Sequence, residues 1–393
     1  MPGFFPIWRA GVLGWASGAL GGGVMEPDSE PLRRAVDGVE ARIEAVARAC
    51  APHIRCAMTP RDRAGVRRGL AEIAVLRQEL ALRINQYRAW RPGVDERPNP
   101  PVPLAGPGRK PSPLPRSLYL NALDLRAQRL AVLTGRLGGM LSRRRQPLFA
   151  PLRPKPSLQD QQLAVSDRVF KTLHQVVNPA DQDADAAAYG CHLDIPLAPS
   201  VFLANAHAAL RLGIAQGRAA MRFIDVGCGG GVKVMLAAEV FAQADGLEYD
   251  PGYVAAAQAA FRLMSVPRAR VFQADAMHFD GYGDYDVIFF YQPMQSAEDL
   301  KQLERRIITM APPGTILIAP YVQFAARAAG LGCGHVGGAV YLSATDQPRT
   351  DALRARAETT GTGLIRPGAP IDPRDGCLTP LIEAARRIGF DLD

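Results

Sequence analysis

The sequence has 393 residues, 48% of them hydrophobic and 21% charged, which excludes wholesale disorder, a collagen and a polytopic membrane protein. Its six cysteines include no CxxC pair and no close cluster, so neither a disulfide scaffold nor a cysteine-rich zinc module is expected. The net charge of +8 is divided unevenly, because residues 1–157 hold 26 Lys/Arg and 12 Asp/Glu whereas the remainder is mildly acidic. Two modules with different partners are therefore expected.

Residues 1–28 are predicted to be an apolar N-terminal extension, with no charge over residues 10–24. That stretch is shorter than the roughly 20 residues that a membrane-spanning helix needs. Three interpretations stay open: a signal peptide, an interfacial anchor, and a flexible extension before a start at Met25. We expect a cytoplasmic protein, which associates with a membrane only if this extension is an anchor.

Residues 29–145 are predicted to form a basic helical region. Apolar residues recur at helical spacing over 32–54 and again over 66–87, with Pro60 between them, which predicts an antiparallel helical hairpin. Residues 91–116 contain nine prolines and are typical of an extended linker. A third helix is expected over 117–142, followed by a second linker over 146–158.

From residue 159 onward, short apolar runs alternate with helical patterns. This alternation predicts an α/β domain over 159–345 with a Rossmann-like, doubly wound, mostly parallel sheet. A helix over 199–217 is expected to begin with Ser200 as its N-cap. Residues 346–393 are expected to be a tail with one short helix near 379–388. Strands are expected at 221–226, 244–248, 269–273, 285–291 and 315–320, with a late edge strand at 339–343.

The strongest local signal is the run DVGCGGG at residues 225–231, which follows an apolar strand pattern and precedes a helical one. Glycines let a ligand approach main-chain N–H groups at the carboxyl end of a strand. A dinucleotide fingerprint would require glycine at position 232, where Val232 stands, and the Gly-Lys-Ser/Thr of a phosphate loop is absent. Asp225 would repel a phosphate, but it suits a cationic amine.

Two more acidic residues end the following two strands. Glu248 lies 23 residues after Asp225, where a carboxylate can accept hydrogen bonds from ribose hydroxyls. Asp275 ends the third strand pattern, where it can accept from an adenine amine, and Ala276 beside it can line the ring. The three strand ends therefore offer acids for an amine, a ribose and an adenine, all of which S-adenosylmethionine carries.

Residues 220–320 resemble the class I S-adenosylmethionine-dependent methyltransferases through the motifs DVGCGGG, GLEYD and QADAMHF. The resemblance implies that S-adenosylmethionine is the cofactor, and it says almost nothing about the substrate. The implied cofactor-binding residues lie in the first motif and at the next two strand ends: Asp225, Gly227, Cys228, Gly229, Glu248, Tyr249, Asp275 and Ala276.

Candidate catalytic residues lie at the end of the fourth strand and in an upstream segment. In this family the fourth strand faces the transferred methyl, and amino-group methyltransferases often carry Asn/Asp-Pro-Pro-Tyr there. Here Tyr291 and Gln292 begin the sequence Tyr-Gln-Pro-Met, so Gln292 can hold an amide or amine beside an aromatic wall, unless the segment is only a structural turn. Tyr189 is a further candidate, because such upstream segments often fold over the cofactor. No metal site is expected.

The expected function is methyl transfer from S-adenosylmethionine to an unidentified acceptor, either nucleic acid or protein. The basic N-terminal half suits nucleic acid or another anionic surface, including a peripheral membrane contact, although its arginines also fit a solvated helix face. The alternative is a non-catalytic methyltransferase-like binding or scaffold protein that forms oligomers through its N-terminal helices.

Overall fold

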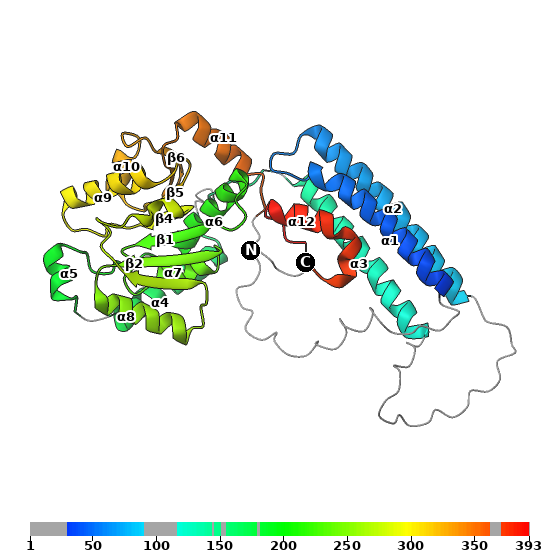
Figure 1. Cartoon of the computed structure of the whole chain (residues 1–393), viewed down its shortest axis with the longest axis horizontal. Helices are drawn as coiled ribbons and strands as arrows, with labels where there is room; N and C mark the ends of the chain where they lie inside the picture. Colours follow the sequence, from blue (N-terminus) through cyan, green and yellow to red (C-terminus); the bar gives the residue numbers. More distant parts are fainter. Residues whose placement is uncertain are drawn as a thin grey trace, which may run out of the picture.

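The computed structural model describes residues 30–89, 116–143, 145–150, 155–178, 181–361 and 371–392. The interpretations of residues 1–28 and nearly all of the proline-rich linker lie outside these residues. The described residues form an α/β body beside a body of long helices (Figure 1). None of the helices in this part of the chain combines the length and the apolar character needed to cross a membrane.

The helical body contains the predicted hairpin and third helix. Helices α1 (Glu30–Cys50) and α2 (Pro60–Ala89) pack side by side, and α3 (Arg116–Ser142) packs along α2 (Figure 1). The apolar stripes that predicted these helices meet in one core, where Ile43 and Ile73 are fully buried. Burying such a side chain contributes about 1.5–3 kcal/mol, which explains why the stripes direct the packing.

The C-terminal segment returns to this helical body. Helix α12 (Thr379–Arg387) buries Leu381 and Ile382 in the same core as α1, α2 and α3. An ion pair between Arg129 of α3 and Asp375, at 2.6 Å, ties the preceding turn to the bundle. The short helix expected near 379–388 is therefore confirmed, and it belongs to the helical body.

The α/β body contains a seven-stranded sheet in the order β3-β2-β1-β4-β5-β7-β6. The first five strands in sequence are parallel, so the prediction of a Rossmann-like, mostly parallel sheet is confirmed. Strands β7 and β6 are antiparallel, and β6, not the predicted segment 339–343, forms the edge. The strands are β1 (Arg222–Val226), β2 (Gln243–Glu248), β3 (Ala269–Gln273), β4 (Val287–Phe290), β5 (Ile316–Ile318), β6 (Gly334–Gly337) and β7 (Val340–Leu342).

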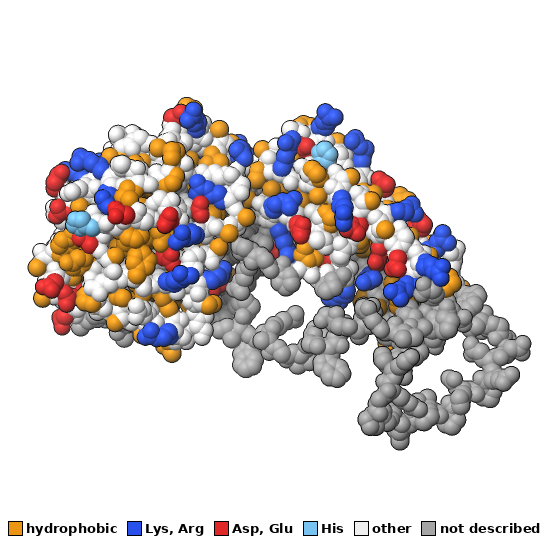
Figure 2. All heavy atoms as spheres, in the orientation of Figure 1, with side chains coloured by type: hydrophobic (Ala, Val, Ile, Leu, Met, Phe, Trp, Pro, Cys, Tyr) orange, Lys and Arg blue, Asp and Glu red, His pale blue; other side chains and the backbone are white. Residues whose placement is uncertain are grey.

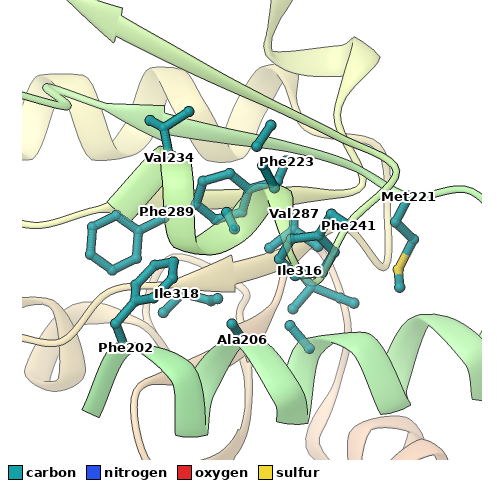
Figure 3. Close-up of a cluster of buried hydrophobic side chains, with 14 of the residues drawn as sticks. Phe202, Ala206, Met221, Phe223, Val234, Phe241, Val287, Phe289, Ile316 and Ile318 are labelled. Carbon is teal, nitrogen blue, oxygen red and sulfur yellow. The ribbon is translucent and has the colours of Figure 1, made fainter. Parts of the chain in front are cut away.

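Helices cover both faces of the sheet. Successive side chains of a strand point to opposite faces, and apolar side chains on each face are buried under helices. Phe223 and Phe289 face the layer that contains α6, where Phe202 packs against them (Figure 3). Ile224 and Phe290, each one residue later, belong to the cluster on the other face. The helices of the first layer are α6 (Pro199–Gln216), α7 (Val232–Ala238) and α8 (Pro251–Leu263); those of the second are α9 (Ala297–Met310) and α10 (Val322–Arg327).

Three local predictions need correction. Ser200 is not the N-cap of α6, because the helix begins after Ala198 and the Ser200 hydroxyl donates to Asp167 of α4 (Leu158–Val177) at 2.6 Å. The tail contains a second helix, α11 (Gln347–Ala357), which has no apolar stripe to reveal it. Strand β6 was missed because its sequence, GHVG, is short and rich in glycine.

Candidate functional site

A small cavity lies at the carboxyl edge of the parallel strands, where the glycine loop meets the ends of β2, β3 and β4. It brings together nine of the eleven residues predicted for the site, and Asp225 and Cys228 are the two that do not line it. The nine are Tyr189, Gly227, Gly229, Glu248, Tyr249, Asp275, Ala276, Tyr291 and Gln292.

The glycine loop joins β1 to α7 in a backbone conformation that other residues adopt with difficulty. Gly227 and Gly229 have φ of 75° and 53°. The Gly227 N–H donates to the carbonyl of Leu247 at 2.8 Å, which fixes the loop against β2. A Cβ on Gly227 would lie 2.8 Å from the Cβ of Pro293, so the close approach of the β4 loop also requires glycine.

Glu248 ends β2 with its carboxylate held by main-chain donors. One oxygen accepts from the Gly229 N–H at 2.7 Å, and the other accepts from the N–H groups of Tyr249 and Asp250 at 2.9 and 3.0 Å. Burial raises the pKa of Glu248, and these hydrogen bonds oppose that rise. A carboxylate has about four acceptor positions, so Glu248 can accept from one ribose hydroxyl without losing a backbone bond.

Asp275 follows β3 and accepts from three donors. Its Oδ2 lies 2.7 Å from the Tyr189 hydroxyl and 2.7 Å from Nδ1 of His278, and its Oδ1 accepts from the Met277 N–H. Burial alone would raise the pKa of Asp275, but the hydrogen bonds from His278 and Tyr189 hold it below its usual value. Asp275 is therefore an ionised acceptor in the lining of the cavity.

Asp225 was predicted to bind the cofactor, but it lies behind the glycine loop and does not line the cavity. Its side chain is fully buried, and neither carboxylate oxygen has a hydrogen-bond partner among the described residues. Burial raises its pKa to about 8, Lys233 opposes the rise, and the carboxylates of Asp194 and Glu248 add to it. The physical reason is that β1 is a central strand, so its side chains are enclosed on both faces.

A buried ion pair that was not predicted from the sequence lines one side of the cavity. Asp194 reaches over the glycine loop and accepts from Nζ of Lys233 at 3.2 Å and from the Gly230 N–H at 3.0 Å. His174 and Asn178 lie against the same carboxylate, at 3.2 and 2.9 Å. Burial would raise the pKa of Asp194, but Lys233 and His174 lower it below its ordinary range.

This ion pair predicts a stability effect. Lys233→Met is expected to lower the free energy of unfolding by about 3 kcal/mol, because it leaves a buried carboxylate without its cation. Adding Asp194→Asn to Lys233→Met should restore part of the loss, which a double-mutant cycle in urea measures. Additive losses in the double variant would contradict the coupling.

The end of β4 presents a strained residue to the cavity. Gln292 has a φ of 49°, although it is not glycine, and its side-chain amide donates to the Gln323 side chain at 3.2 Å. The ring of Tyr291 lies next to that of Tyr321, with centroids 6.4 Å apart. Backbone strain of this kind is typical of functional sites, where the surrounding structure holds it in place.

The strain at Gln292 predicts a gain in stability on substitution. Gln292→Gly should raise the free energy of unfolding by about 1 kcal/mol, because glycine adopts a left-handed φ without a Cβ penalty. Gln292→Ala is the matched control and should not gain, since it keeps the Cβ. Urea unfolding in which alanine stabilises as much as glycine would contradict the argument.

Cys228 has a structural position in the loop. Its side chain is fully buried in the core, next to Gly246, whose added Cβ would lie 2.7 Å from its sulfur. Burial raises the pKa of Cys228 well above its ordinary value, so the thiol stays protonated. Its side chain therefore packs in the core and does not line the cavity.

Comparison with known proteins identifies this part of the chain. Residues 218–340 match the family model described as a methyltransferase domain. The prediction of a class I S-adenosylmethionine-dependent methyltransferase domain is thereby confirmed for this region, without pointing to a particular member. No curated protein matched the sequence.

Solved structures are similar over a smaller part of the chain. The YcgJ protein of Bacillus subtilis is 18% identical over 29% of this chain and 50% of its own, with a TM-score of 0.24. An RNA methyltransferase from Salinibacter ruber is 23% identical over 28% of this chain and 70% of its own, with a TM-score of 0.24. An amino pentose methyltransferase from Micromonospora echinaspora is 24% identical over 31% of this chain and 51% of its own, with a TM-score of 0.27. The chain thus covers about half the length of the first and third of these proteins.

The residues around the cavity fit S-adenosylmethionine chemically. Glu248 suits a ribose hydroxyl and Asp275 suits an adenine amine. Lys233, which is paired with Asp194, also lines the cavity and suits a carboxylate. Among the described residues, no group of three or more His, Cys, Asp and Glu side chains is placed to hold a metal ion.

Proposed function

We propose that this protein transfers a methyl group from S-adenosylmethionine to an acceptor that approaches the end of β4. The observation that carries the proposal is that the glycine loop and the acids ending β2 and β3 line one cavity within a methyltransferase domain. Glu248 would hold the ribose, Asp275 the adenine amine, and Lys233 the carboxylate.

When bound, the cofactor supplies a methyl on a sulfonium that is already electrophilic, so the protein mainly has to position the acceptor and exclude water. Gln292 is the polar side chain at the end of β4. Its carbonyl oxygen can accept a hydrogen bond from the N–H of an amine or amide substrate, while Tyr291 supplies an aromatic wall. Tyr189 is a poor candidate for a general base here, because its hydroxyl donates to Asp275. Its pKa is raised by burial and by that carboxylate, so it holds its proton at neutral pH.

We further propose that the helical body recruits the acceptor through its arginines. Figure 2 shows arginine side chains interspersed with acids over this body. Several arginines are already paired, such as Arg42 with Glu79 and Arg126 with Glu40. The exposed residues Arg61, Arg67 and Arg68 on the first half of α2 add positive charge of the kind that phosphate groups attract.

The test is a labelling experiment on a cell extract. The protein is incubated with methyl-labelled S-adenosylmethionine and an extract divided into nucleic-acid and protein fractions, each with and without nuclease. Label in a nuclease-sensitive fraction supports a nucleic-acid acceptor, and label in protein supports a protein acceptor. Cofactor binding without label in any fraction would contradict the proposal of methyl transfer and favour a non-catalytic binding module.

A further inference from the structure

Resting on the proposed function, we propose that the Tyr189 side chain occupies the place of the adenine ring, so that the cofactor must displace it to bind. Tyr189 ends α5 (Ala184–Tyr189), in the arm formed by residues 183–195, which precedes α6.

The cavity is too small for the ligand that its lining fits. Its volume is about 40 Å³, which suits a few water molecules at most. Pockets for ligands of cofactor size measure about 300–1,000 Å³. Some of the residues that line the cavity must therefore move before an adenosyl group can enter.

Tyr189 makes the two contacts that an adenine would make in the same place. Its ring is stacked on Tyr249, with centroids 4.6 Å apart and an angle of 4° between the ring planes. Its hydroxyl donates to Oδ2 of Asp275 at 2.7 Å, as an exocyclic amine would. A third ring between the two tyrosines would need faces roughly 7 Å apart, so adenine cannot stack on this side of Tyr249 while Tyr189 stays.

The arm is anchored directly after Tyr189, so the tyrosine side chain is the part that can move. Cys191 pairs with Met294 in an antiparallel bridge, and the His192 N–H donates to the carbonyl of Pro293 at 3.0 Å. Asp194 is held by Lys233 and by the Gly230 N–H. In contrast, Tyr189 lies next to Gly190, whose φ of 86° ends α5, and it is only partly buried.

If Tyr189 occupies the adenine place, the apparent affinity for the cofactor is the intrinsic affinity multiplied by the fraction of molecules whose site is open. Removing the competitor should therefore tighten the binding of any ligand that carries adenine. Tyr189→Ala is expected to bind S-adenosylhomocysteine and adenosine about tenfold more tightly than the natural chain, the factor that one hydrogen bond to a charged group contributes. Tyr189→Phe keeps the stacked ring and loses the hydroxyl, so it should fall between the two.

The experiment is calorimetric titration of the full chain and its variants with S-adenosylhomocysteine and with adenosine. Tyr285→Phe is the matched control, because it removes another tyrosine-to-aspartate hydrogen bond, to Asp245 at 2.9 Å, and Tyr285 does not line the cavity. Its affinities should equal those of the natural chain.

The possible results separate this proposal from the proposed function. Tighter binding of both ligands by Tyr189→Ala supports displacement. Weaker or unchanged binding by Tyr189→Ala overturns displacement and leaves the methyltransferase proposal standing, because Tyr189 would then contact the cofactor or lie apart from it. If neither the natural chain nor any variant binds S-adenosylhomocysteine, both proposals fail.

Discussion

Asp225→Asn is expected to stabilise the protein increasingly as the pH rises from about 4 to about 8. The pKa of Asp225 is about 8 in the folded chain, against about 3.9 in an unfolded one. The folded state therefore binds more protons than the unfolded state over this range, and the natural chain loses about 1.4 kcal/mol of stability per pH unit. Asparagine cannot ionise, so the variant escapes a loss that reaches several kcal/mol.

The measurement is urea unfolding of the natural chain and Asp225→Asn at several pH values across this range. Asp194→Asn is the contrasting variant, since the pKa of Asp194 lies below its ordinary value. A depressed pKa contributes stability above the unfolded pKa and loses it only as the pH falls, so its effect should be constant above about pH 5. A difference between Asp225→Asn and the natural chain that does not change with pH would refute the buried, protonated state.

Glu248→Ala is expected to weaken the binding of S-adenosylhomocysteine about a hundredfold. The carboxylate ends β2 inside the cavity, and a hydrogen bond from a ribose hydroxyl to a charged group contributes up to about 3 kcal/mol. The substitution also leaves the N–H groups of Gly229, Tyr249 and Asp250 without their acceptor, so some loss of stability accompanies it.

Calorimetric titration measures this effect, and circular dichroism checks that the variant stays folded. Glu298→Ala removes a glutamate whose side chain is 71% exposed on α9, and it serves as the control with unchanged affinity. Glu248→Gln keeps the shape of the side chain and loses its charge, so it should bind more weakly than the natural chain and more tightly than the alanine variant. A folded Glu248→Ala that binds as the natural chain does would remove Glu248 from the site.

The positions of Glu248 and Asp275 were predictable from the sequence, because each ends a strand pattern and parallel strands end at one edge of a sheet. The position of Asp225 was not predictable, since the motif DVGCGGG does not reveal that both carboxylate oxygens of Asp225 are enclosed behind the loop. The pair of Lys233 and Asp194 spans 39 residues of sequence, and no local pattern links the two residues.

The helical body shows the same division between local and long-range information. Helical spacing predicted α1, α2 and α3, because their buried faces recur regularly along the chain. The packing of α12 against them depends on contacts between residues separated by most of the chain, such as Arg129 with Asp375. No local pattern specifies such contacts, so the sequence alone did not predict that the C-terminal segment completes this core.

Photochemical cross-linking of methyl-labelled S-adenosylmethionine, followed by mapping of the labelled peptides, tests the central claim most directly. The structure predicts label in the peptides that contain the glycine loop and the ends of β2 and β3, residues 225–250 and 273–277. Excess S-adenosylhomocysteine should abolish this label. Label confined to the helical body, or label that the competitor does not reduce, would contradict a cofactor site at this edge of the sheet.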